Sequence, residues 1–221
     1  MTRGEKKVKE RNGKRRSREQ SPKRMPDLGY YFIATDTKET EENYINGLKD
    51  SLPESLRGRI VVKVFKTKTH KLIEKCLEAA ALEPQYGEPW IVFDRDEVEN
   101  FDDIIQRAER KGVNVGWSNP CIEIWFHAYF GNMHSYADAA SCCSDFADFF
   151  YRKTGKEYKK SDPQIYELLN RYGDEEKAIQ IAEQRLNGHA AAGVTKPSAM
   201  NPGTTLHRLV GEIRRKGTTE G

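Results

Sequence analysis

Apolar residues in the first half of the chain follow two patterns in turn. Short runs rich in aromatic and β-branched residues indicate strands, and stretches with apolar residues three or four positions apart indicate helices. The runs show little internal alternation, which is typical of strands covered on both faces of a parallel sheet. Because the two patterns alternate, we predict βαβ units with right-handed crossovers. The predicted strands are residues 28–36, 59–65, 90–93 and 113–117, and the predicted helices between them are 37–52, 69–82 and 101–112.

Residues that favour helix ends border these helical stretches. Thr37 or Thr40 is a suitable N-cap for the first helix, and Pro53 helps to end it. Asn100 is a suitable N-cap for the third helix, and Gly112 is placed to end it.

The alternation stops after Ser118. Residues 119–130 form an apolar and aromatic segment with one carboxylate, and we predict a helix there. Residues 135–155 and 162–188 also have helical spacing, and a last helix is predicted over 204–215. The predicted fold class is therefore α/β, a parallel sheet flanked by helices with a C-terminal helical layer. The predicted parts are an arm over residues 1–26, an α/β core over 27–130, and a helical extension over 131–221 that packs on the core.

Charge divides the chain unevenly. The net charge of +3 over 221 residues combines a basic segment, residues 1–26, with a mildly acidic remainder. The basic segment has almost no apolar side chains and is predicted to be disordered. It is either a nucleic-acid-binding arm, in which Lys and Arg contact phosphates, or a solvated tail.

Other features of the composition indicate a cytoplasmic protein. No apolar stretch is long enough to span a membrane, so we expect no membrane association. The four cysteines, which have no CxxC or zinc-finger spacing, indicate a reducing compartment. The oligomeric state is left open, with a homo-oligomer as one possibility.

Acidic residues follow several of the predicted strands. Asp94 and Asp96 come directly after Trp90–Phe93, and their i, i+2 spacing points both carboxylates the same way if the strand geometry persists. Asp36 ends the first strand, and Glu123 follows the fourth. Ligands gather at the carboxyl ends of parallel strands, and clustered carboxylates favour a hard divalent cation such as Mg²⁺. The pattern indicates metal-dependent phosphoryl chemistry.

Each of these residues also has an ordinary structural interpretation. Asp94 and Asp96 are suitable caps for the next helix, and Glu123 is favoured at a helix N-terminus by the macrodipole. His127 lies in an aromatic segment, where we expect a packed, hydrogen-bonded side chain rather than a catalytic one.

The order of motifs resembles the Toprim fold and, more narrowly, the RloB-like family of bacterial Toprim-related proteins. The likeness covers about residues 28–215. It is carried by KETEENYINGL (38–48), VFDRDE (92–97) with NFDD behind it, SNPCIEIW (118–125), YKK (158–160) and NPGTTLHRLV (201–210).

This resemblance implies a nuclease that uses Mg²⁺ or Mn²⁺, with Asp36, Asp94 and Asp96 as metal ligands. Glu41 matches a second acidic position of the family. Glu123 is then a further ligand or positions a base, and Lys159 or Lys160 contacts the phosphate. The resemblance also implies a role in anti-phage defence and an ATPase partner.

The sequence departs from the family pattern after the first strand. Where the family has a CEGEKTE-like segment, this chain reads TDTKETE, so Asp36 replaces a glutamate and Thr37 a glycine. Either the metal site is rearranged, with Glu39 or Glu41 assisting, or the activity is changed or lost.

Two classes of function follow. The first is a metal-dependent endonuclease that cleaves RNA, tRNA included, or DNA as a toxic defence effector. The second is a catalytically degenerate scaffold that binds an ATPase, nucleic acid or both. A third hypothesis, a phosphotransferase or primase-like enzyme, has no glycine-rich nucleotide loop to support it.

Overall fold

Four parallel strands form the centre of the molecule in a computed structural model that describes residues 28–36, 39–96 and 98–217. With the short β5 (Gly203–Thr204) they form a five-stranded sheet of order β2-β1-β3-β4-β5. This order places β1 (Tyr31–Thr35) between β2 (Ile60–Val64) and β3 (Glu88–Asp94). β4 (Asn114–Asn119) pairs with the other side of β3, and the first four strands are parallel. The predicted α/β class with a mostly parallel sheet is confirmed.

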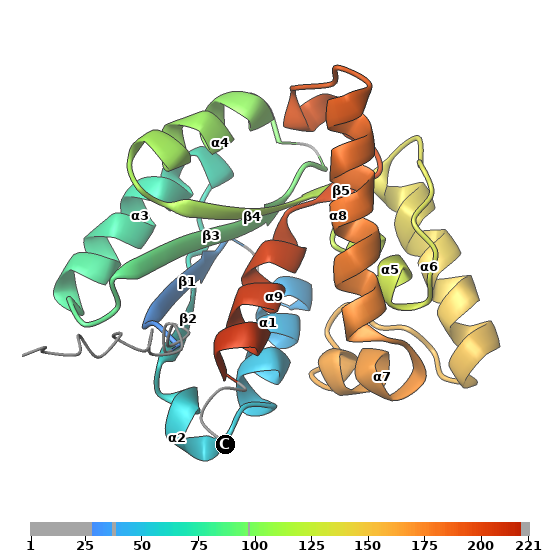
Figure 1. Ribbon diagram of the computed structural model, residues 1–221, viewed down its shortest axis with the longest axis horizontal. Coiled ribbons are helices and arrows are strands. Elements are labelled where there is room, and N and C mark those ends of the chain that lie inside the picture. The colour runs from blue at the N-terminus through green and yellow to red at the C-terminus, as the bar shows by residue number, and fades with distance from the viewer. Residues whose placement is uncertain (1–27, 37–38, 97, 218–221) are drawn as a thin grey trace, which may run out of the picture.

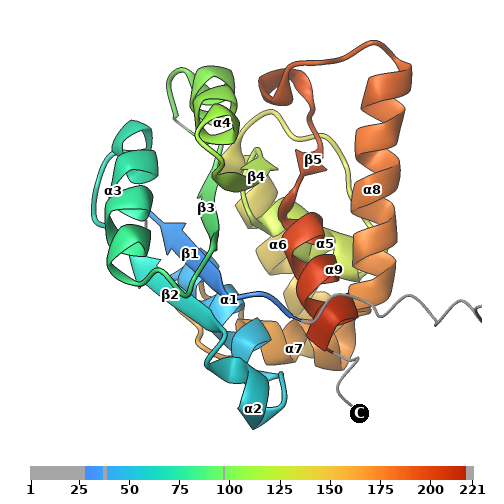
Figure 2. The ribbon, with the colours of Figure 1, turned by 60° about the vertical axis from the view of Figure 1, so that its left-hand side comes forward.

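Helices cover both faces of this sheet (Figures 1 and 2). On one face, α3 (Thr69–Leu82) and α4 (Phe101–Arg110) pack on side chains such as Phe32 and Ile91. On the other face, the alternate side chains Tyr31 and Ile33 pack against a larger apolar cluster from the remaining helices. The central strand β1 is buried along its whole length because neither of its faces meets water.

The larger cluster holds the C-terminal helices against the core. These are α5 (Glu123–Tyr129), α6 (Ala139–Thr154), α7 (Ile165–Tyr172), α8 (Glu175–Ala191) and α9 (Leu206–Gly217), joined by α1 (Thr40–Asp50) and the short α2 (Glu54–Arg57). Helix α5 packs against α6 and α8, and α7 packs against α1. The predicted helical layer is therefore present, while the basic segment 1–26 lies outside the described residues.

The predicted end of the chain is wrong in one respect. Gly203–Thr204 forms a short strand, β5, antiparallel to β4, so the last helix begins at Leu206 and not at Thr204. A short 3₁₀ helix, η1 (Pro197–Ala199), precedes β5. A two-residue strand has no periodic pattern, and its pairing with residues 118–119 depends on tertiary contact.

One predicted helix cap, Thr40, is wrong, and another, Asn100, is confirmed in position only. The N-cap position of α1 is Glu39, with a φ of 103°, and Thr40 is the first helical residue. Thr37 lies outside the described residues. Asn100 does occupy the N-cap position of α4, but in a left-handed conformation and without a side-chain hydrogen bond to the helix.

None of the described helices has the length and apolar character needed to cross a lipid bilayer.

Candidate active site

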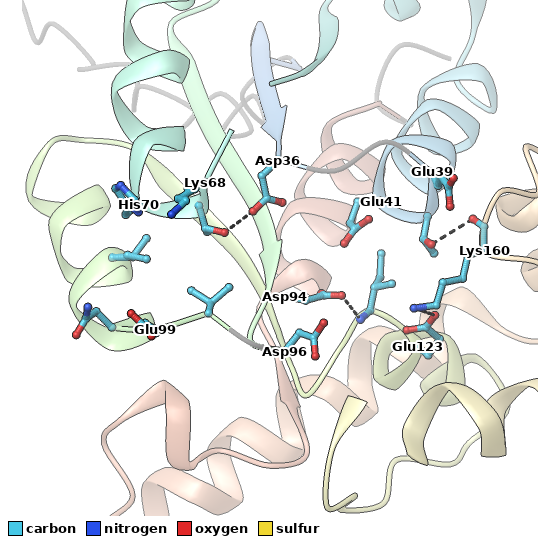
Figure 3. Close-up of a pocket in the computed structure, with 16 residues that line it drawn as sticks. Asp36, Glu39, Glu41, Lys68, His70, Asp94, Asp96, Glu99, Glu123 and Lys160 are labelled. Carbon is cyan, nitrogen blue, oxygen red and sulfur yellow. Dashed lines mark hydrogen bonds and ion pairs between the residues drawn. The ribbon is translucent and has the colours of Figure 1, made fainter. Parts of the chain in front are cut away.

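A pocket of about 690 Å³ opens at the carboxyl ends of β1, β3 and β4 (Figure 3). Among the described residues that line it, seven carry carboxylates and two are lysines. The lining includes every acidic residue that the sequence and the resemblance selected, together with Lys160: Asp36, Glu39, Glu41, Asp94, Asp96 and Glu123. The strand ends thus converge as predicted.

Asp36 follows the last residue of β1. Thr69, the first residue of α3, donates a hydrogen bond from its hydroxyl to Oδ2 of Asp36. Burial raises the pKa of Asp36 above its usual value, and the bond from Thr69 acts in the opposite direction. The side chain is therefore held in one orientation at the pocket wall.

Asp94 ends β3 and is fixed by the next turn of the chain. The backbone N–H of Ile122 donates to Oδ2 of Asp94 at 2.9 Å. The pKa of Asp94 is raised well above its usual value, first by burial and then by the negative charges of Glu41, Glu123 and Asp36. Four carboxylates from four segments therefore share one electrostatic environment.

Asp96 has a different backbone geometry from the one predicted. Its φ of 21° takes it out of the strand, and its N–H donates to the carbonyl of Pro120 at 3.0 Å. The extended i, i+2 relationship to Asp94 is wrong because β3 ends at Asp94. Asp96 still lines the pocket below Asp94 (Figure 3), while Glu97 lies outside the described residues.

Glu41 enters the pocket from the first turn of α1, where its side chain is 7% exposed. Figure 3 shows Glu41 above Asp94, with Asp36 to the left of Glu41 at the upper wall. Glu39 lies at the N-cap of the same helix, on the edge of the pocket.

Glu123 and Lys160 form the side of the pocket nearest the helical layer. Oε1 of Glu123 accepts a hydrogen bond from the Tyr158 hydroxyl at 2.8 Å and lies 3.8 Å from the Lys160 ammonium. Thr40 Oγ1 donates to the Lys160 carbonyl at 3.1 Å, which connects this loop to α1. Burial lowers the pKa of Lys160, but the charge of Glu123 and the interactions with Cys143 and Cys121 together outweigh it, so the net shift is upward. Lys159 points elsewhere and pairs with Glu157 at 3.7 Å.

The chemistry of the donor set suits a hard divalent cation. Clustered carboxylates with few cations favour Mg²⁺ or Mn²⁺, which take oxygen ligands. Among the described residues, however, no three acidic side chains have ligand oxygens all within 4.8 Å of one another. Mg²⁺ usually takes one or two carboxylates and completes its shell with waters and a substrate phosphate, so an open arrangement of this kind still fits it.

Several lining residues were missed from the sequence. Lys68, Thr69 and His70 come from the start of α3, and Glu99 from the turn before α4. β2, the strand that precedes α3, ends without an acidic residue, so the sequence offered no signal for this part of the pocket. It is the pairing of β2 with β1 that brings the start of α3 to Asp36. His127 is packed and hydrogen-bonded, as expected: it is fully buried, and its Nε2 lies 3.2 Å from the Tyr136 hydroxyl.

Comparisons with known proteins bear on the same residues. A search of curated proteins and a search of solved structures each found no match. The family model described as RloB-like protein matches residues 31–213, a range that contains all the pocket residues named above. The chain therefore belongs to the RloB-like protein family.

Proposed function

We propose that this protein is a Mg²⁺-dependent, Toprim-type nuclease that cleaves phosphodiester bonds in RNA, tRNA included, or in DNA. The observation that carries this proposal is the convergence of Asp94 with Asp36, Glu41 and Glu123 in one pocket. Burial first, and then these three negative charges, raise the pKa of Asp94. Such mutual repulsion is relieved when a divalent cation binds, and nucleases commonly use this chemistry.

Asp94, Asp96 and Asp36 are the proposed metal ligands, and Mn²⁺ is an alternative ion. A bound Mg²⁺ would polarise the scissile phosphate and neutralise charge that develops on its oxygens. Glu41 and Glu123 lie close enough to influence the charge on Asp94 and are suited to orienting a water or a proton. Lys160 and Lys68 supply positive charge at opposite sides of the pocket, where they can contact substrate phosphates (Figure 3).

The biological role follows from the family resemblance. We propose a toxic effector in bacterial anti-phage defence, active in the cytoplasm and regulated by an ATPase partner. The basic segment 1–26 is proposed to add phosphate contacts to the bound nucleic acid.

The test compares nucleic-acid cleavage by the purified parent protein and by Asp94→Asn and Asp96→Asn. Labelled RNA and DNA are incubated with Mg²⁺ or Mn²⁺ and, separately, with a chelator. Asp103→Asn, an exposed carboxylate on α4, is the matched control. We expect cleavage by the parent and the control only, and only with metal. Equal cleavage by all four proteins would assign the activity to another site or to a contaminant.

A second function is favoured by the replacement of the family glutamate by Asp36. The shorter side chain is bonded to Thr69, and Asp36, Asp94 and Asp96 do not come together within 4.8 Å. A degenerate scaffold that binds nucleic acid or an ATPase is consistent with this arrangement. Calorimetry that finds no Mg²⁺ binding, with nucleic-acid binding retained and dependent on residues 1–26, would favour the scaffold.

A further inference from the structure

Two thiols and one carboxylate that are distant in sequence meet beside the acidic pocket. Cys121 lies between β4 and α5, Glu123 begins α5, and Cys143 lies on α6. Their ligand atoms, two Sγ and one carboxylate oxygen, all lie within 4.8 Å of one another. Cys121 and Glu123 are buried, and Cys143 is partly exposed.

We infer that Cys121, Cys143 and Glu123 bind a borderline-soft divalent cation of the Zn²⁺ type, at a site separate from the proposed Mg²⁺ ligands. Thiolates select Zn²⁺ over Mg²⁺, because Mg²⁺ requires oxygen ligands. Two thiolates and one carboxylate leave a fourth tetrahedral position for water.

The distance between the sulfurs suits this ion. The two Sγ atoms are 3.8 Å apart. Two thiolates bound to one tetrahedral zinc ion, each about 2.3 Å from the metal, are themselves about 3.8 Å apart. The sulfurs therefore already lie at the separation that coordination requires, and the carboxylate oxygen lies within 4.8 Å of both.

The carboxylate gives an independent reason to expect a ligand. Glu123 is 1% exposed, and while its Oε1 is bonded by Tyr158, its Oε2 is buried with no hydrogen-bond partner among the described residues. A thiol–thiol hydrogen bond alone explains the contact between the sulfurs but leaves this oxygen unsatisfied. Buried unsatisfied oxygens are uncommon in folded proteins, and a missing ion is one of their causes.

Charge and access are also compatible with the ion. Binding replaces two thiol protons, which pass to solvent, so that two thiolates and the Glu123 carboxylate face the divalent ion. The excess negative charge is matched by Lys160, whose ammonium is 3.8 Å from Glu123 Oε1. The Lys160 side chain is 55% exposed, so the ion can enter along the partly exposed side chains of Lys160 and Cys143.

Occupancy would connect the turn beside the pocket to helix α6. Cys121 directly precedes Ile122, whose N–H holds Asp94, and Cys143 belongs to α6. A metal ion shared between them would fix this turn to the helical layer. The proposal makes no use of catalysis and does not depend on the proposed nuclease activity.

The test uses the metal-free full chain in a non-chelating reductant, titrated with Cd²⁺ as a spectroscopic substitute for Zn²⁺. We expect a thiolate-to-metal charge-transfer band that saturates at one equivalent and is removed by added Zn²⁺. Cys121→Ser and Cys143→Ser should each lose about half of the band and at least roughly tenfold in affinity, since even outer-shell changes cost about that much. Glu123→Gln should keep the full band at saturation but bind more weakly.

Two further variants serve as controls. Cys76→Ala removes a buried thiol of the opposite apolar cluster, bonded to the Trp90 carbonyl, and should leave the band intact. Asp94→Asn should also keep the band, so failure of the Mg²⁺ site and failure of this site are distinguishable. Thermal melts check folding, and Zn²⁺ should raise the melting temperature of the parent more than that of the two serine variants. The absence of a band in the folded parent protein, or a band of undiminished size in both serine variants, would overturn the proposal.

Discussion

The backbone N–H of Ile122 donates a hydrogen bond to Oδ2 of Asp94 at 2.9 Å, connecting the end of β3 to the turn before α5. This contact brings Asp94 next to Glu123. Asp94 ends β3 and Glu123 follows β4, and the parallel pairing of β3 and β4 places both residues at the same edge of the sheet. The acidic pocket results from this geometry, and the closeness of its carboxylates should lower the free energy of unfolding by a measurable amount.

Removing the charge of Asp94 should stabilise the metal-free protein. Because the pKa of Asp94 is raised in the folded state, the free energy of unfolding should fall as pH rises above the usual range of an aspartate. Asp94→Asn lacks this cost, so its melting temperature should exceed that of the parent at pH 8 and approach it at pH 4. The measurement is thermal unfolding in chelator at both pH values. If Asp94→Asn is less stable than the parent at pH 8, burial and repulsion between Asp94 and its neighbouring carboxylates do not destabilise the metal-free protein.

With Mg²⁺ present at pH 8, the melting temperature of the parent should instead exceed that of Asp94→Asn. The parent should gain stability on adding the ion, because a ligand that binds only the folded state stabilises it by mass action. Asp94→Asn should gain little. An equal gain in both proteins would show that Mg²⁺ acts elsewhere.

Thr69 is expected to position Asp36. Thr69→Val deletes the hydroxyl that bonds Asp36 Oδ2 while keeping a β-branched side chain of similar size. Loss of a partner that orients a metal ligand typically costs about 10–100-fold in metal affinity. We expect a fall of that size in Mg²⁺ affinity by calorimetry, and near-parent affinity for Thr69→Ser. If both variants bind like the parent, Asp36 is not a ligand or does not need this bond.

Lys160 and Lys159 provide a matched pair for the phosphate contact. Lys160 lines the pocket, whereas Lys159 pairs with Glu157 outside it. Lys160→Ala should weaken nucleic-acid binding and reduce the slope of log K against log salt by about 1. Lys159→Ala should change neither quantity. Binding is measured by fluorescence anisotropy at several salt concentrations, and equal effects in the two variants would remove Lys160 from the site.

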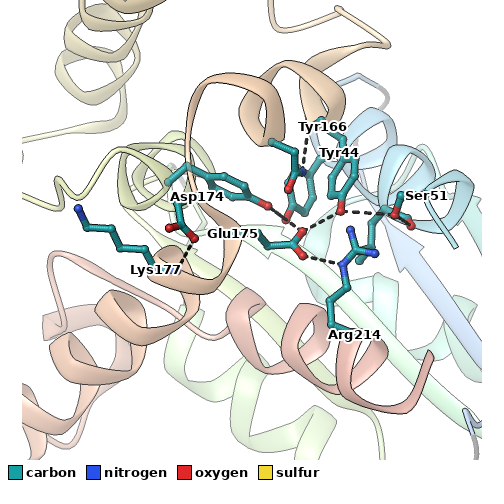
Figure 4. Close-up of polar contacts among 10 residues, drawn as sticks. Tyr44, Ser51, Tyr166, Asp174, Glu175, Lys177 and Arg214 are labelled. Atoms are coloured by element: carbon teal, nitrogen blue, oxygen red, sulfur yellow. Dashed lines mark hydrogen bonds and ion pairs between the residues drawn. The ribbon is translucent and has the colours of Figure 1, made fainter. Parts of the chain in front are cut away.

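Glu175 should make stability depend on pH in a range distinct from that of the pocket. Its Oε2 accepts hydrogen bonds from Tyr166 at 2.8 Å and Tyr129 at 3.1 Å, and its Oε1 from Arg214 at 2.6 Å (Figure 4). These contacts join α8 to α5, α7 and α9. Burial raises the pKa of Glu175 to about 7, although hydrogen bonds with Tyr129 and Asn170 act in the opposite direction.

The direction follows from linkage. Between pH 4.5 and 7 the folded state holds the Glu175 proton more tightly than the unfolded state does, so this contribution to stability is lost as pH rises to about 7. It amounts to at most about 3 kcal/mol. Glu175→Gln cannot titrate, and its urea-derived free energy of unfolding should show a shallower pH dependence over this interval. An unchanged slope would show that Glu175 is already ionised at low pH.

Local patterns in the sequence determined the elements and the main acidic residues. The helix over residues 69–82 is found at the predicted bounds, and Asp36, Asp94 and Glu123 follow strands that the apolar runs predicted. These features could be predicted because periodicity is set by neighbours along the chain, and because parallel strands must end at one edge of a sheet.

Contacts between distant segments were decided only by the tertiary structure. The order β2-β1-β3 brings Thr69 to Asp36, and a positive φ at Asp96 ends the strand geometry that spacing alone had extended. Cysteine spacing indicated no metal site, yet packing of α6 beside α5 places Cys143 next to Cys121. The physical reason is that spacing describes one segment at a time, whereas these contacts depend on how the buried faces of separate segments pack together.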